Sequence, residues 1–416
     1  MLAALIRFSL TQRVFVGILV LVAMALGVRA WLALPIDAFP DIAPTQVKII
    51  LKAPGMTAEE VEQQVTQLIE TELLGIPDQQ MLRSVTKYAI TDITLDFRDG
   101  TDIYWARQQV NERLANVRDS LPDTVSGGVA PMSTPLSEMF MFTVENPNLS
   151  LMERRQLLDW EIRPVLRTVP GVADVNVLGG YARTFQVTPR AAMLAQAGIS
   201  MEDLEQAIAD NNVNLGAGRL EQGNDTLVVR TEGRIESRQQ LANLVVKVVG
   251  QHIYRLGDVA DVSIGHLARY GAVTRNGEET TQALIIALKD SNTAEVVAGV
   301  KRKLADIGPT LPPGTELNVF YDRATLIDTA IETISSALFQ AIAIVVVLAL
   351  FLGNLRAAVV VSLSLPLSAL ATFYLMSVAG LSANLMSLGG LVIAIGMLVD
   401  SSVVVVENVV TTMSTR

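Results

Sequence analysis

The sequence predicts a membrane α-helical bundle of four helices joined to a large polar α+β region. Residues 357–399 carry no charged side chain over 43 residues, and runs of this length are typical of membrane-spanning segments. Residues 14–34 form a second apolar run, which is interrupted only by Arg29. Between these ends, residues 35–334 alternate between strand-like and helix-like patterns, which predicts an α+β fold there.

Charged residues are distributed unevenly between the apolar ends and the polar block. The 416 residues have a formal net charge of −10, and 50% of them are hydrophobic. Five of the 32 basic and two of the 42 acidic residues lie outside residues 35–334, so that block carries 27 basic and 40 acidic residues, a net charge of −13. This acidity argues against nucleic acid as a partner. The chain has no cysteine and only two histidines, which excludes thiolate and histidine-rich metal sites.

The apolar ends are long enough for four membrane helices. Residues 14–34 can span a bilayer, and no small-residue cleavage site of a secretory signal follows them. One helix cannot use the whole run 357–399 to cross about 30 Å of hydrocarbon, so we expect a break at "SVAGLSANL" (377–385). The predicted membrane segments are 1–36, 326–355, 356–378 and 385–412, with helices at about 13–34, 333–353, 356–377 and 385–410.

Basic residues predict how these helices are oriented. They flank the apolar segments at positions that fall on one side of the membrane: Arg7, Arg13, Arg356 and Arg416. This side should be the cytoplasm, because short cytoplasmic loops carry an excess of basic residues. Arg29 lies near a helix end, from which its side chain can reach the interface. The sequence therefore places residues 35–332 on the far side of the membrane.

The first part of the polar block has the order of a split β-α-β sandwich. Strand-like segments flank an amphipathic helix at 57–75, which opens with the capping box Thr57 and Glu60. A second amphipathic helix, "TDIYWARQQVNERLANVRDSL" (101–121), follows the strands. The resulting β-α-β-β-α order predicts a ferredoxin-like βαββαβ subdomain at 37–133.

An internal echo predicts a second, related subdomain. "RLANVRDSLP" (113–122) aligns with "KLADIGPTLP" (303–312). The second copy is too long for one such sandwich, so we expect it at 134–183 and 266–325, with an inserted module at 184–265.

Two carboxylates lie inside the fourth apolar segment, in "GMLVDSSVVVVEN" (396–408). Asp400 and Glu407 are seven residues apart, so on a helix they share one face about 10 Å apart along the axis. A carboxylate in hydrocarbon costs about 3 kcal/mol, and protonation removes that cost. We predict that both residues relay protons. The alternative is a structural ion pair, for which the membrane segments offer only Arg29 and Arg356, both near helix ends.

Methionines are weak candidates for metal contacts. Met386 and Met397 lie in the fourth apolar segment, and thioether sulfur suits monovalent copper or silver. The alternative is that they pack as ordinary apolar side chains. We interpret His252 and His266 as surface residues. The sequence has no phosphate-binding loop, dinucleotide fingerprint or nucleophile elbow, so it predicts neither an enzyme nor a bound cofactor.

Three long segments resemble one family of transporters: "LPIDAFPDIAPTQVKI" (34–49), "GTDIYWARQQVNERL" (100–114) and "NLMSLGGLVIAIGMLVD" (384–400) with its trailing "EN". They are similar to the resistance–nodulation–division (RND) efflux transporters, and the first two to the heavy-metal-efflux branch. The resemblance covers the whole chain.

The resemblance implies the N-terminal part of a proton-driven exporter of metal cations in the inner membrane of a Gram-negative cell. It implies a homotrimer with periplasmic porter subdomains and a docking module, which works with a periplasmic adaptor protein and an outer-membrane channel. Family members have twelve membrane helices, so the chain ending at Arg416 is expected to be inactive alone. Ala394 stands where many divalent-cation exporters carry aspartate, which leaves copper/silver and cobalt-zinc-cadmium types open. Export of organic compounds, or a role as a non-transporting assembly subunit or remnant, also stays open.

Overall fold

Four long helices occupy the predicted apolar segments. They are α2 (Arg13–Ala33), α13 (Arg323–Leu352), α14 (Leu355–Val378) and α15 (Leu385–Ser414). The computed structural model describes residues 7–9, 11–34, 36–40, 43–134, 136–222, 225–231, 233–289, 291–352 and 355–414. Within these ranges α2, α13 and α15 are long and apolar enough to cross a membrane, and α14 has a shorter apolar stretch, Ser362–Val378.

The start of α13 differs from the sequence prediction. The expected helix began at 333, whereas α13 begins at Arg323 and continues without a break. Its first turns are polar and reach the second sheet, so hydropathy, which detects only the apolar part of a helix, placed the start too late. The described helices pack closely. A Cβ on Gly27 of α2 would meet Leu370 at 2.6 Å, so glycine permits the contact with α14. The ring of Trp31 lies 4.5 Å from that of Phe373 in a tilted contact.

The first α/β unit has a four-stranded antiparallel sheet. Its elements are β1 (Gln46–Lys52), α3 (Ala58–Val61), the π-helical turn η1 (Glu62–Thr66), α4 (Gln67–Leu73), β2 (Gln79–Lys87), β3 (Ile90–Phe97), α5 (Ile103–Val117), the 3₁₀ turn η2 (Arg118–Ser120) and β4 (Ser126–Val129). The predicted capping box of Thr57 and Glu60 is confirmed. The strand order β2-β3-β1-β4, with apolar side chains buried between sheet and helices, is that of a split β-α-β sandwich.

The second α/β unit repeats this strand order. Its elements are β5 (Glu138–Glu145), α6 (Leu151–Leu157), the π-helical turn η3 (Leu158–Ile162), α7 (Arg163–Leu166), β6 (Val172–Gly179), β13 (Val273–Arg275), β14 (Glu278–Ala287), α12 (Thr293–Ile307), the 3₁₀ turn η4 (Gly308–Thr310) and β15 (Glu316–Asp322). The central order is β6-β14-β5-β15, which corresponds strand for strand to the first sheet. The echo in the sequence lies where α5 runs into η2 and α12 runs into η4.

A segment inserted between β6 and β13 forms a separate core. Its elements are β7 (Arg183–Pro189), α8 (Ala191–Ala197), α9 (Met201–Asp210), β8 (Leu215–Gln222), β9 (Asp225–Thr231), α10 (Arg238–Ala242), β10 (Val245–Val249), β11 (His252–Arg255), α11 (Leu256–Val259) and β12 (Ala260–His266). Strands β7 and β12 pair along their whole length and connect the segment to the second unit. Its buried side chains include Leu194, Leu204, Leu241 and Leu256.

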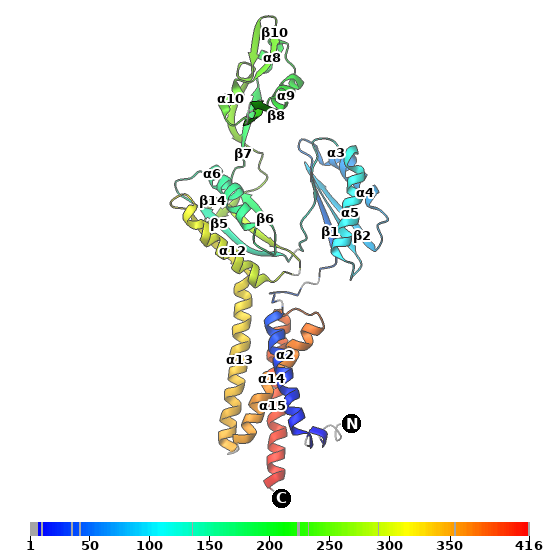
Figure 1. Cartoon of the computed structure of the whole chain (residues 1–416), viewed down its shortest axis with the longest axis vertical. Coiled ribbons are helices and arrows are strands. Elements are labelled where there is room, and N and C mark those ends of the chain that lie inside the picture. The colour runs from blue at the N-terminus through cyan, green and yellow to red at the C-terminus, as the bar shows by residue number, and fades with distance from the viewer. Residues whose placement is uncertain are drawn as a thin grey trace.

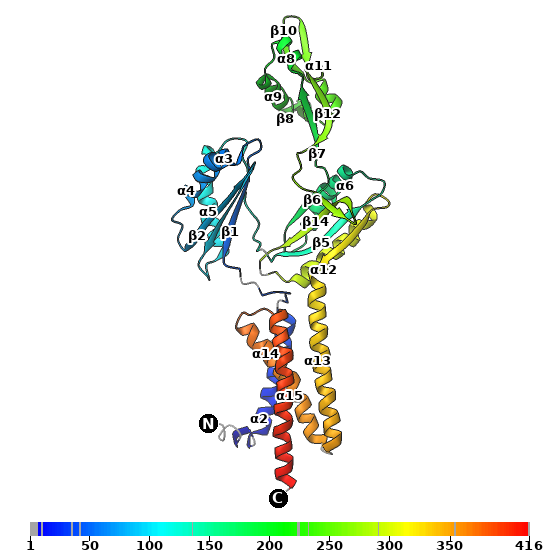
Figure 2. The ribbon, with the colours of Figure 1, turned by 180° about the vertical axis from the view of Figure 1, so that it is seen from behind.

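These parts give an elongated molecule (Figure 1). The four long helices lie at one end, the two α/β units stand beside each other beyond them, and the inserted segment lies at the far end. The view from behind shows the same succession (Figure 2).

Candidate functional site

Helix α15 carries both carboxylates that we predicted to relay protons. Its first turn is held by Asn384, whose side-chain oxygen accepts hydrogen bonds from the N–H groups of Met386 (3.1 Å) and Ser387 (3.0 Å). The Ser387 hydroxyl accepts from the Asn384 N–H at 2.9 Å, which completes a reciprocal cap. The continuous helix then holds Asp400 and Glu407 about 10 Å apart along its axis.

One face of α15 is packed and another is open in this chain. The packed side chains recur at helical spacing: Leu388, Leu391 and Ile395. Asp400 lies on the open side and makes no ion pair with any described basic residue. Met386 and Met397 are 74% and 69% exposed. The structure therefore brings no described partner to Asp400, whereas the side chain of Glu407 lies outside the described residues.

The candidate metal contacts do not converge. Met386 and Met397 lie on one helix about 16 Å apart along its axis, so their sulfur atoms cannot bind one ion together. Among the described residues, no three acidic or histidine side chains are grouped closely enough to hold a metal. His252 meets the Tyr254 ring edge-on, and His266 lies against the Tyr181 ring in a tilted contact, so both imidazole rings have aromatic neighbours.

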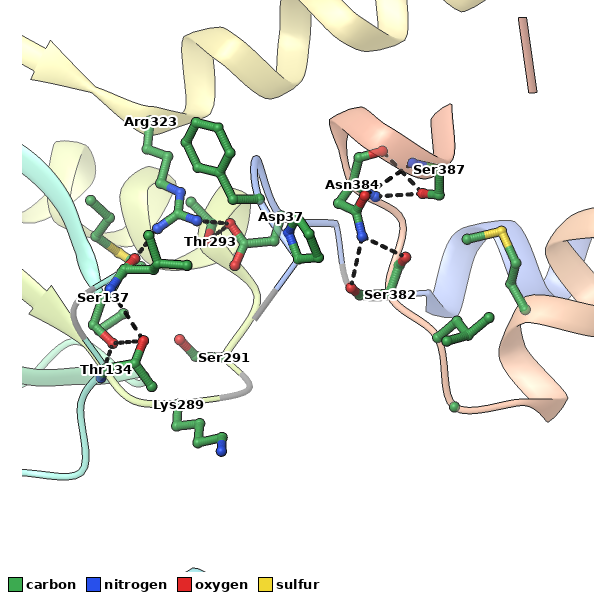
Figure 3. Close-up of a pocket in the computed structure, with 18 of the residues that line it drawn as sticks. Asp37, Thr134, Ser137, Lys289, Ser291, Thr293, Arg323, Ser382, Asn384 and Ser387 are labelled. Carbon is green, nitrogen blue, oxygen red and sulfur yellow. Dashed lines mark hydrogen bonds and ion pairs between the residues drawn. The ribbon is translucent and has the colours of Figure 1, made fainter. Parts of the chain in front are cut away.

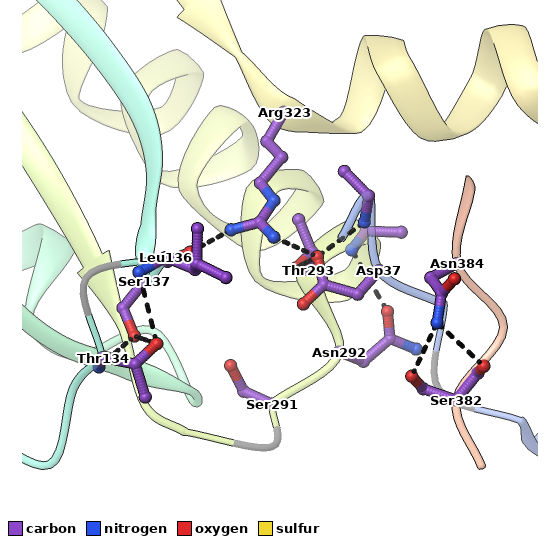
Figure 4. A network of polar contacts seen from close by, with 12 residues as sticks. Asp37, Thr134, Leu136, Ser137, Ser291, Asn292, Thr293, Arg323, Ser382 and Asn384 are labelled. Carbon is purple, nitrogen blue, oxygen red and sulfur yellow. Dashed lines mark hydrogen bonds and ion pairs between the residues drawn. The ribbon is translucent and has the colours of Figure 1, made fainter. Parts of the chain in front are cut away.

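An ion pair connects the loop after α2 to the second α/β unit (Figure 4). The Asp37 carboxylate lies 2.9 Å from the guanidinium of Arg323, the first residue of α13. The Arg323 side chain is 3% exposed and also donates to the Leu136 carbonyl. The Thr293 hydroxyl donates to the same Asp37 oxygen at 3.0 Å. A buried guanidinium of this kind depends on its carboxylate partner.

Backbone hydrogen bonds hold the same loop to the start of α15. The N–H of Asp37 donates to the Ala383 carbonyl at 2.9 Å, and the N–H of Leu385 donates to the Ala38 carbonyl at 3.2 Å. The loop after α2, the loop before α15, the first turn of α12 and the first turn of α13 therefore meet at one junction.

A pocket of about 880 Å³ opens beside this junction (Figure 3). Lys289, Arg323 and Asp37 are the charged side chains in its lining, together with hydroxyl groups and the thioethers of Met139 and Met376. Two positive charges against one negative charge disfavour a metal cation. We interpret the junction as a structural connection between helices and sheet.

Sequence reasoning missed this junction. Asp37 was identified only within a segment typical of a family, and Arg323 looks like any basic residue that precedes an apolar helix. The two residues lie at opposite ends of the α/β region, so only the folded chain shows that they pair.

Known proteins resemble this chain along its whole length. The model of the AcrB/AcrD/AcrF family matches residues 5–416. This chain belongs to the AcrB/AcrD/AcrF family. Within it, the chain is 41% identical over 416 residues to Protein HelA of Legionella pneumophila, covering 98% of this chain and 39% of that protein.

Relatives in the AcrB/AcrD/AcrF family confirm the resemblance to heavy-metal RND transporters. The chain is 38% identical to the cobalt-zinc-cadmium resistance protein CzcA of Cupriavidus metallidurans (99% of this chain, 39% of the relative). It is 36% identical to the cation efflux system protein CusA of Escherichia coli K12 (98% and 39%). A crystal structure of a heavy metal efflux pump superposes with a TM-score of 0.85 at 34% identity, covering 98% of this chain and 41% of that one.

These relatives are named as efflux and resistance proteins, so the family is one of transporters and not of enzymes. The chain spans about two fifths of the length of the relatives it matches.

Proposed function

We propose that this chain forms the N-terminal portion of a proton-driven pump that exports metal cations across a Gram-negative envelope. The observation that carries the proposal is Asp400, a carboxylate on an apolar helix that no described basic residue neutralises. Such a group gains most from taking up a proton, and it can bias a conformational equilibrium when it does so. The names of the relatives supply the class of substrate.

The proposed topology places all four long helices in the inner membrane and residues 35–332 in the periplasm. The distribution of basic residues supports it. The arrangement in Figure 1 agrees, because both α/β units and the inserted segment lie beyond the same end of the four helices.

The proposed subdomains follow the folded units. Residues 37–133, and residues 134–183 with 266–325, act as two porter subdomains, which the repeated strand order supports. Residues 184–265 act as the docking module toward an outer-membrane channel, since this segment has its own core and lies farthest from the helices. The complete pump is a homotrimer that also binds a periplasmic adaptor.

In the proposed proton relay, Asp400 matters more than Glu407. Asp400 lies near the middle of α15 and Glu407 nearer its C-terminal end, where water can serve the site. Met386 and Met397 remain weaker candidates, as separate waypoints for a soft cation.

The test is proton-gradient-driven metal uptake into inverted membrane vesicles that contain the pump. Asp400→Asn keeps the shape of the side chain but cannot carry a proton, so we expect transport to be lost while protein level and assembly stay normal. Glu407→Gln should be milder. Ser401→Ala is the matched control, because Ser401 is an exposed neighbour on the same helix. Transport by Asp400→Asn at more than about half the wild-type rate would contradict the relay.

A further inference from the structure

The second α/β unit carries an arginine-rich hollow. Its volume is about 610 Å³, and α6, η3 and α7 form one wall. Four arginines line it: Arg155, Arg163, Arg167 and Arg183. So many guanidinium groups are unexpected in this block, which has a net charge of −13.

Carboxylates within the chain neutralise only part of this charge. Arg155 pairs with Asp159 at 2.6 Å. Arg163 and Arg167 share the single carboxylate of Asp174, at 3.3 and 3.4 Å.

Two of the four arginines have guanidinium atoms without a partner among the described residues. Arg183 is exposed and makes no ion pair with a described residue. The Nε of Arg163 is buried without a described hydrogen-bond partner. The hollow therefore keeps an excess of two positive charges over the carboxylates that contact it, and Arg183 presents an exposed guanidinium to an outside partner.

An exposed aromatic side chain marks the rim of this hollow. Trp160 is 77% exposed, and it lies in the π-helical turn η3, which interrupts the α-helix at this point. Single π-helical turns often occur at functional sites. Tryptophan and arginine are among the residues that are enriched at the centres of protein–protein interfaces.

A complementary acidic surface lies on the first α/β unit. The continuous helix formed by α3, η1 and α4 contains five glutamates and no basic residue. Two of them are engaged, since Glu60 caps the helix and Glu72 pairs with Arg113. The other three make no ion pair with a described residue: Glu59, Glu62 and Glu70.

We propose that the acidic helix of one copy of this chain docks in the arginine-rich hollow of the next copy. Figures 1 and 2 show α3 and α4 at a similar distance from the four long helices as α6. Copies anchored in one membrane share their orientation, so the two surfaces meet at the same height. The contact is head-to-tail because the two surfaces are on different units, and such contacts form a ring when the rotation between copies closes. The proposal rests on the membrane topology of the proposed function.

The test uses cysteine pairs, because the natural chain has no cysteine. Glu62→Cys and Arg167→Cys are introduced into two differently tagged chains, which are expressed together in the membrane and treated with a short bismaleimide. We expect a crosslinked species that carries both tags. Glu205→Cys replaces Glu62→Cys in the control, since Glu205 is an exposed glutamate on α9 in the inserted segment.

Charge-reversal variants test whether the acidic helix and the arginine-rich hollow attract each other or only lie close together. Arg167→Glu with Arg183→Glu keeps the Arg163–Asp174 pair, and the Cys probe is then moved to Trp160. We expect about a tenfold loss of crosslinking, and recovery when the partner carries Glu59→Arg and Glu70→Arg. Equal crosslinking of the Glu205 control, or no loss on reversal, overturns the proposal.

Two further outcomes are informative. Absence of crosslinks between copies, with Trp160→Cys protected from maleimide, assigns the hollow to another part of a longer polypeptide and overturns the proposal. Asp400→Asn tests the two proposals separately, because it should abolish transport and leave crosslinking unchanged.

Discussion

At the scale of single residues, the Asp37–Arg323 pair is the buried ion pair of the junction between the helices and the second α/β unit. Removing one partner of a buried pair leaves the other charge without compensation, which costs more than the pair itself contributes. Asp37 keeps a 27% exposed side chain, so solvent reduces part of that cost, whereas Arg323 is 3% exposed. Substitution of Arg323 should therefore destabilise the protein more than substitution of Asp37.

Arg323→Met should destabilise the protein by about 3 kcal/mol, because Asp37 and the Leu136 carbonyl both lose a donor. The measurement is denaturant unfolding in detergent. Arg98→Met is the matched control. Its ion pair with Asp78 is 70% and 48% exposed, so the change should cost less than about 1 kcal/mol. Equal effects of the two substitutions would show that the junction is not a structural connection.

The double variant Asp37→Asn with Arg323→Met measures the coupling of the two side chains. We expect it to be destabilised by less than the sum of the single changes, since the second change removes the charge that the first one left unpaired. Additive losses would contradict a direct interaction.

At the scale of elements, the N-terminus of α9 contains a titratable cap. The N–H of Ser200 donates to Asp203, and Lys247 donates to the same carboxylate oxygen at 2.8 Å. The hydrogen bond from Lys247, followed by that from the Ser200 backbone, lowers the pKa of Asp203 to about 2. The unfolded value is about 3.9. Because the folded pKa is the lower one, the cap stabilises α9 above pH 4 and loses this effect as the pH falls toward 2.

Protection of the α9 amides against hydrogen exchange should decrease as the pH falls from about 4 to about 2, after correction for intrinsic rates. Lys247→Met should move the decrease to higher pH, because it removes the main cause of the lowered pKa. Helix α10 is the internal control. Its capping box uses Ser237 and the uncharged Gln240, so its protection should not follow this titration. A parallel loss in α10 would point to general acid unfolding.

At the scale of the whole molecule, the two α/β units repeat one topology, and the second unit carries an inserted segment. Both sheets have the same strand order, and the two second helices begin with equivalent caps, Asp102 and Asn292. The inserted segment leaves the second unit through paired strands and does not disturb its core. This arrangement places both α/β units and the insertion beyond one end of the helices.

Reporter fusions test that arrangement in the membrane. Alkaline phosphatase inserted after Gly250, in the turn between β10 and β11, should be active, and a fusion at the C-terminal end after Arg416 should be inactive. A cytoplasmic reporter at the same positions should give the opposite pattern. Activity of alkaline phosphatase at the C-terminal end alone would reverse the proposed topology.

The sequence by itself determined the four long helices, the two carboxylates of α15, the capping box of Thr57 and Glu60, and the presence of a repeat. These features are local, because hydropathy, helical spacing and cap chemistry act within a few turns of one segment. Only the tertiary structure decided that Arg323 pairs with Asp37, that α13 extends beyond its apolar part, and that four arginines meet in one hollow. Those features join residues far apart in the chain, and a charged side chain carries no local sign of the partner that folding will bring to it.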